Sequence, residues 1–74
     1  MSLPSQIRGL LSLEGKKIYE LAEYFDMSPQ AMRNKICRSS FSSGDLKKFA
    51  NFLEAELVIE TKSGQRVVLN EKDN

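Results

Sequence analysis

Side chains that can make paired hydrogen bonds gather in one short segment of the chain. Gln30 and Asn34 each carry an amide group, and Arg33 between them carries a guanidinium. An amide side chain pairs bidentately with adenine and a guanidinium with guanine, while the ring of Pro29 can meet a thymine methyl. Residues 30–48 hold five cations against one carboxylate, although the net charge of the whole chain is only +1. This segment therefore predicts contacts to base edges in a duplex.

Cations and hydroxyls near this segment suit phosphate oxygens, which set register without reading sequence. Backbone N–H groups at the start of a helix also attract anions, and Lys47 follows such a start. The residues expected to contact phosphate are Lys17, Ser28, Lys35, Arg38, Ser39, Ser40 and Lys47.

Apolar residues at helical spacing predict four helices that position these side chains. In the first helix, Ile7, Leu10 and Leu11 form one stripe, and Gly15 is placed to end the helix. The predicted helices cover about residues 4–14, 17–25, 29–38 and 43–54.

Polar residues mark where two of these helices begin. Ser28 before Pro29 supplies an N-cap and a first-turn proline. Ser42 and Asp45 have the spacing of a capping box. The boundaries at about residues 29 and 43 therefore have a local chemical cause.

A short turn joins the second and third predicted helices. Only residues 26–28 separate them, which forces a sharp crossing. Small Ala22 allows a close approach, and Met27, Met32 and Ile36 are expected to fill the corner. The spacing predicts a helix-turn-helix over about residues 17–38.

The run from Leu21 to Ile36 resembles the helix-turn-helix of Cro/repressor-like bacterial and phage regulators, and the resemblance covers about residues 5–55. It implies a DNA-binding transcription regulator. The position of Asp26 is commonly glycine in that family, so the resemblance implies a left-handed backbone there. The position of Ile18 is often a glutamine that touches phosphate, a contact that Lys16 or Lys17 would have to replace.

After Glu56 the apolar period changes from helical to alternating, which predicts a hairpin over about residues 56–70 with Gly64 at its tip. Both faces carry apolar residues. One face, with Leu57, Ile59, Val67 and Leu69, is expected to pack on the first and fourth helices. In proteins of the resembling family, C-terminal strands can form the dimer contact. The predicted dimer interface contains Phe52, Val58 and Val68.

Length and composition bound the architecture. A chain of 74 residues predicts one domain over residues 4–70 and a charged tail over residues 71–74. The expected fold class is mainly α with a small β addition: a four-helix, repressor-like helix-turn-helix domain followed by a C-terminal β-hairpin. With one cysteine and no histidine, neither an internal disulfide nor a zinc site is expected. Cys37 is expected to fill a small buried or half-buried space.

Residue types and motifs that the sequence lacks argue against several classes of function. Without histidine, a Gly-rich phosphate loop or an activated nucleophile, we expect no enzyme, no catalytic residue and no cofactor. No apolar stretch has the length of a membrane span, and a lone thiol suits a reducing compartment, so a cytoplasmic protein without membrane contact is expected.

The expected function is sequence-specific binding of double-stranded DNA by a homodimer. The chain would be a repressor-like transcription regulator that reads the major groove with the helix from about Pro29 to Arg38. The alternative is a protein-interaction module, such as an antitoxin-like or adaptor protein that uses the same fold on a protein partner.

Overall fold

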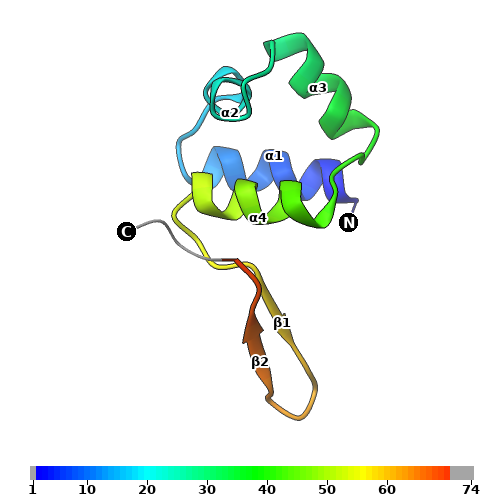
Figure 1. Ribbon diagram of the computed structural model, residues 1–74, viewed down its shortest axis with the longest axis vertical. Helices are drawn as coiled ribbons and strands as arrows, with labels where there is room; N and C mark the ends of the chain where they lie inside the picture. The colour runs from blue at the N-terminus through cyan, green and yellow to red at the C-terminus, as the bar shows by residue number, and fades with distance from the viewer. Residues whose placement is uncertain (1, 71–74) are drawn as a thin grey trace. The chain divides into compact units, whose positions relative to one another are not determined.

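The computed structural model describes residues 2–70, which form four helices followed by a two-stranded antiparallel sheet (Figure 1). The predicted fold class, mainly α with a small β addition, is confirmed, and each helix boundary lies within two residues of its prediction. The predicted tail over residues 71–74 lies outside the described residues. The elements are α1 (Leu3–Leu13), α2 (Ile18–Tyr24), α3 (Pro29–Cys37), α4 (Ser43–Phe52), β1 (Val58–Glu60) and β2 (Arg66–Val68).

The chain divides into two compact units at the junction between Phe41 and Ser42. The first unit contains α1, α2 and α3, and the second contains α4 and the hairpin. The single domain predicted over residues 4–70 stays a prediction.

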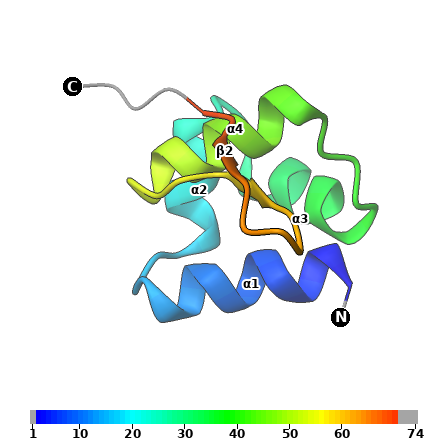
Figure 2. The same cartoon turned by 90° about the horizontal axis from the view of Figure 1, so that it is seen from below.

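In the first unit, α3 lies in contact with both α1 and α2 (Figure 1, Figure 2). Each helix turns one apolar stripe inward. Leu10 is an exception to the prediction, because it is 44% exposed. Residues three and four positions after Ile7 lie on opposite sides of it around the helix, and the core covers only the side of Leu11. The buried residues of this unit are Ile7, Leu11, Leu21, Ala22, Phe25, Met32 and Ile36.

The four helices end in the same way. In each, the residue after the C-cap has a left-handed backbone, and the next N–H bonds back to a carbonyl five residues earlier, which is a Schellman motif. The left-handed backbone expected at Asp26 is confirmed. Only one of the four positions is a glycine, so three carry the steric cost of a Cβ. The φ angles are 66° at Gly15, 57° at Asp26, 53° at Ser39 and 54° at Glu54.

The predicted helix starts are confirmed by their hydrogen bonds. The Ser28 hydroxyl accepts from the Ala31 N–H at 3.1 Å, with Pro29 in the first turn of α3. Ser42 and Asp45 cap α4 reciprocally, since each backbone N–H donates to the other's side chain. These bonds satisfy helix N–H groups that have no partner within the helix.

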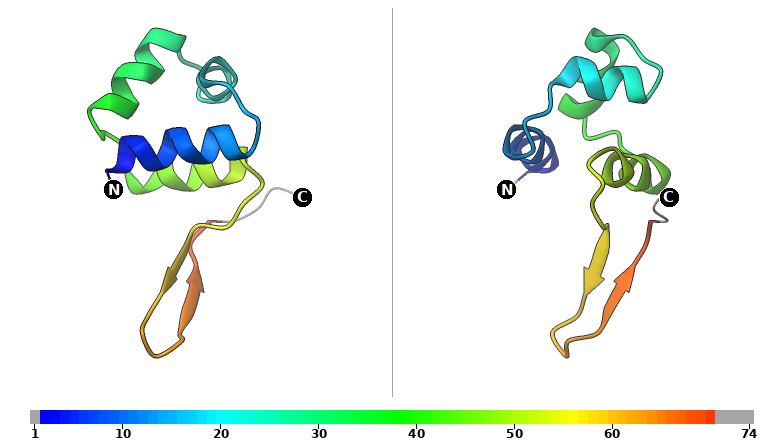
Figure 3. Two further views of the ribbon diagram at one scale, coloured as in Figure 1. Left: turned by 180° about the vertical axis from the view of Figure 1, so that it is seen from behind. Right: turned by 90° about the vertical axis from the view of Figure 1, so that its left-hand side faces the viewer.

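The second unit holds the hairpin in the predicted place. Val58 lies opposite Val68 and Ile59 opposite Val67, and Gly64 at the tip has a φ of 90° (Figure 3). Ile59 and Val67 are each 56% exposed, so α4, the helix of the same unit, does not cover this face as predicted. The strands are only three residues long, so the hairpin presents little surface for a helix to cover.

The base of the hairpin is held by a buried polar side chain. Asn70 is 6% exposed, and its Oδ1 accepts from the Leu57 N–H at 2.7 Å. Its Nδ2 donates to Asn51 Oδ1 at 2.7 Å and to the Ala55 carbonyl at 3.0 Å. Asn70 therefore ties the end of the hairpin to the C-terminal part of α4 and to the segment that follows it.

Candidate nucleic-acid interface

The outward row of α3 carries the two amides that the sequence singled out. Met32 and Ile36 are fully buried and fix the rotation of the helix. Gln30 and Asn34 are therefore exposed, and Gln30 Nε2 donates to Asn34 Oδ1 at 3.3 Å. Since residues four apart are neighbours on a helix, this bond aligns the two amides on one face.

The next row of α3 turns toward α1. Arg33 and Cys37 are four residues apart, and Arg8 Nη2 on α1 donates to Cys37 Sγ at 3.1 Å. The prediction that Cys37 is a buried or half-buried filler is wrong, because Cys37 is exposed. It lies beside the Met32/Ile36 stripe and not on it, so packing leaves the thiol at the surface.

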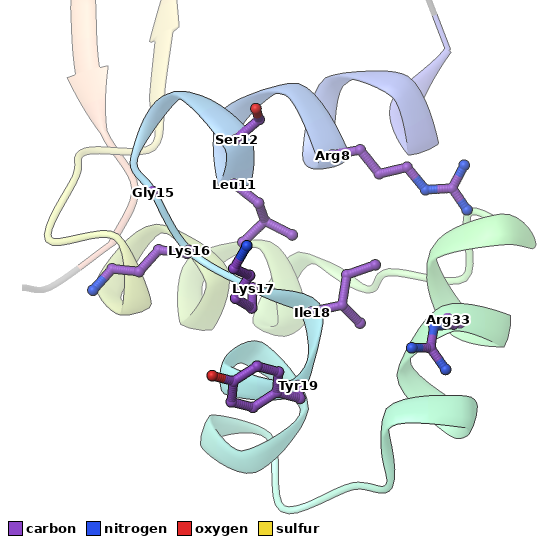
Figure 4. A pocket seen from close by; sticks show the side chains of 9 residues that line it. All are labelled: Arg8, Leu11, Ser12, Gly15, Lys16, Lys17, Ile18, Tyr19 and Arg33. Carbon is purple, nitrogen blue, oxygen red and sulfur yellow. The ribbon is translucent and has the colours of Figure 1, made fainter.

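An open pocket of about 580 Å³ lies between α1, the start of α2 and α3 (Figure 4). Figure 4 shows Arg33 reaching from α3 toward Ile18 at the start of α2. Tyr19 lies next to Ile18, and Lys16 points away from α3. Four of the pocket's nine lining residues are cationic and none is acidic. The lining residues are Arg8, Leu11, Ser12, Gly15, Lys16, Lys17, Ile18, Tyr19 and Arg33.

The loop after α3 engages two of the predicted phosphate contacts. Lys35 Nζ donates to the Ser40 carbonyl at 3.2 Å and lies 5.7 Å from the centroid of the Phe41 ring. The Ser40 hydroxyl donates to the Lys35 carbonyl at 3.2 Å. The Phe41 ring in turn lies 6.0 Å from that of Phe25. Lys35 and Ser40 thus have a structural task that the sequence did not indicate, and their phosphate contacts stay predictions.

The other predicted site residues are distributed over both units. Lys17, Ser28, Arg38 and Ser39 are exposed in the first unit, around the ends of α2 and α3. The second unit holds Lys47, Phe52, Val58 and Val68, of which Lys47 and Val68 are exposed and the other two half-buried.

The sequence through α3 carries charges of one sign, whereas Glu23 and Asp26 line a second pocket with Pro29 at the start of the helix. Between Asp26 and Asp45 the chain has no acidic residue, and Arg33, Lys35 and Arg38 lie within that stretch. Clustered cations attract polyanions and raise their association rate. The positive charge near the amide row therefore comes from α3 and its C-cap, while the start of the helix has two acidic neighbours.

One residue of this surface, Arg8, was missed from the sequence. Arg8 and Tyr19 line the pocket, and Tyr19 is 60% exposed. The signal for Arg8 was that it follows Ile7, which the sequence predicts to be buried, and so lies at the edge of the helix contact. Helix periodicity does not say which neighbouring helix a residue at that edge contacts.

Comparison with protein-family models, with curated proteins and with solved structures finds no match. Within residues 2–70, no helix has the length and apolar character needed to cross a membrane. The same part of the chain has no group of three or more histidine, cysteine or acidic residues placed to hold a metal ion.

Proposed function

We propose that this protein binds double-stranded DNA in a sequence-specific manner, with α3 in the major groove, and that it acts as a repressor-like transcription regulator. The observation that carries the proposal is the exposed Gln30–Asn34 row on a helix anchored by buried Met32 and Ile36. Amides in this arrangement match the donor and acceptor of an adenine edge.

The dimensions of α3 support this use. The nine residues of α3 form a helix that is about 10–12 Å across with its side chains, and the major groove is about 12 Å wide. Pro29, Gln30 and Asn34 lie in the first two turns, which is the part of a recognition helix that meets base edges. Lys17, Ser28, Arg38 and Ser39 surround the ends of α2 and α3, where they would contact the sugar-phosphate backbone.

The proposal includes a homodimer in the cytoplasm. One short helix reads only a few base pairs, so two half-sites about one helical turn apart are needed for useful specificity. The hairpin supplies an apolar surface for a second copy: Val68 is 43% exposed and Ile59 and Val67 more so. The exposed thiol of Cys37 suits the reducing conditions of a cytoplasm.

The first experiment measures the salt dependence of binding to a random-sequence duplex by fluorescence anisotropy. Between about 50 and 200 mM salt the affinity should fall by orders of magnitude, because bound phosphates release counterions. Lys47→Ala should flatten the log–log slope by roughly one without changing the preferred sequence. An affinity that does not depend on salt contradicts DNA binding.

The second experiment tests whether α3 recognises bases, by measuring affinity for a panel of single-base variants of a selected binding site. Gln30→Ala should relax specificity at one position at a cost of about 1–3 kcal/mol there. Gln65→Ala, in the hairpin turn, is the matched control for removing an exposed amide. Because Gln30 bonds to Asn34, the double variant should cost less than the sum of the single variants. A uniform loss across the panel would show that α3 docks on the backbone.

One observation favours a second candidate, a protein-interaction module. The hairpin exposes apolar residues on both faces, which suits a protein partner. In that case Ile59→Ser and Val67→Ser would abolish a salt-insensitive interaction with the partner, and no duplex would bind at low salt.

A further inference from the structure

We propose that the pocket between α1, the start of α2 and α3 is a binding site for a phosphate group, held by Arg8, Lys17 and Arg33. The phosphate comes from the backbone of a duplex or from a free nucleotide. The duplex source rests on the proposed function, whereas the affinity of the pocket for phosphate does not.

The charge of the pocket is the first argument. Its cations come from three different elements: Arg8 from α1, Lys17 from the N-cap of α2 and Arg33 from α3. No carboxylate lines the pocket. The nearby carboxylate of Glu20 accepts from the Lys17 backbone N–H at 3.0 Å and so caps α2. A lining with cations and no carboxylate favours an anion, and guanidinium groups match phosphate oxygens in geometry.

The shape of the pocket is the second argument. A volume of about 580 Å³ is within the range of pockets that hold nucleotide-sized molecules. Leu11 and Ile18 supply apolar lining, and the exposed ring of Tyr19 can stack on a sugar or base. The pocket therefore combines cationic and apolar lining.

The position of Arg33 is the third argument. Arg33 belongs to the row of α3 that meets Arg8 through Cys37, and it reaches toward Ile18 (Figure 4). The amides of Gln30 and Asn34 occupy the neighbouring row. Arg33 thus holds phosphate, in place of the base contact expected from its residue type.

The duplex arm of the test uses Arg8→Gln, Lys17→Gln and Arg33→Gln, with Lys62→Gln at the hairpin tip as the matched control. Each pocket variant should weaken binding to all members of the site panel alike and flatten the log–log salt slope by roughly one, while the control changes neither. All four melting temperatures should equal that of the unmodified chain. If Arg33→Gln instead alters preference at one base pair with an unchanged slope, Arg33 reads a base and the proposal is overturned.

The nucleotide arm titrates ATP, pyrophosphate and adenosine into the isotope-labelled protein and follows backbone amide signals. Binding of ATP and pyrophosphate, with shifts at residues 8–19 and 33 that Lys17→Gln abolishes, identifies a free-nucleotide site. Tyr19→Ala should then weaken ATP severalfold and leave pyrophosphate unchanged. Loss of duplex affinity without any nucleotide binding identifies the DNA backbone as the source.

The two arms separate failure of the pocket from failure of the proposed function. In one outcome the protein binds phosphate through Arg8, Lys17 and Arg33 and yet does not bind duplex DNA. That result supports the pocket and contradicts the DNA-binding proposal. Duplex binding that none of the three pocket variants changes, together with no nucleotide binding, leaves DNA binding in place and overturns the pocket.

Discussion

The helical first unit and the hairpin of the second unit use their apolar residues in opposite ways. In the first unit, Leu21, Met32 and Ile36 are fully buried. In the hairpin, Ile59 and Val67 are each 56% exposed, and the buried residue at its base is the polar Asn70. Burial of apolar surface drives folding, whereas a satisfied polar contact contributes little net free energy. The comparison teaches that α3 stands on a packed apolar core, whereas the hairpin is held by local hydrogen bonds.

The largest expected effect is in the first unit. Met32→Ala should lower the free energy of unfolding by about 2–5 kcal/mol, because it removes buried volume and leaves a cavity. The measurement is urea denaturation followed by circular dichroism. Ile59→Ala in the hairpin is the control and should change stability by less than about 0.5 kcal/mol. Equal losses for the two variants would mean that the hairpin contributes to the core as much as α3 does.

The next effect concerns Asn70. Asn70→Leu should destabilise the protein by about 1–3 kcal/mol, because the Leu57 N–H and the Asn51 side chain lose their partners. Hydrogen exchange should show faster exchange of the Leu57 amide with little change in the amides of α3. Asn34→Ala is the control, because Asn34 is an exposed asparagine of α3. Unchanged protection at Leu57 would mean that this bond does not hold the hairpin.

A smaller effect, of opposite sign, is expected at the helix ends. Asp26→Gly, Ser39→Gly and Glu54→Gly should each stabilise the protein by about 0.5–1 kcal/mol, because strain at a positive φ is relieved at some cost in chain entropy. The increments should add, since the three sites are separate. Gln6→Gly within α1 should destabilise by about 1 kcal/mol. A lower melting temperature for Asp26→Gly would reveal a side-chain role of Asp26.

The smallest effect on stability is expected at the surface of the hairpin. Val68→Lys should change the free energy of unfolding by less than about 0.5 kcal/mol, because Val68 is exposed. Sedimentation at high micromolar concentration should show a dimer for the unmodified chain and a folded monomer for the variant, with weaker operator binding. A monomeric unmodified chain that also stays monomeric on DNA would remove the hairpin interface.

The sequence by itself determined the local parts of this protein. Ser28 with Pro29, and Ser42 with Asp45, set helix starts through bonds to residues three positions away. The change to alternating apolar residues after Glu56 located the hairpin. These features depend on neighbours within a few residues, so the pattern of residue types was sufficient to predict them.

Only the tertiary structure decided which surfaces meet. The approach of Arg8 to Cys37 joins residues 29 positions apart, and it accompanies the rotation of α3 that places the Arg33 row beside α1. Asn70 is buried because Asn51 and Ala55 lie beside it, 19 and 15 residues away in the chain. Burial and partner choice depend on how helices rotate against one another, and a periodic pattern gives an inward side but not the identity of its neighbour. For this physical reason the amide row of α3 could be predicted from sequence, whereas the basic pocket beside it could not.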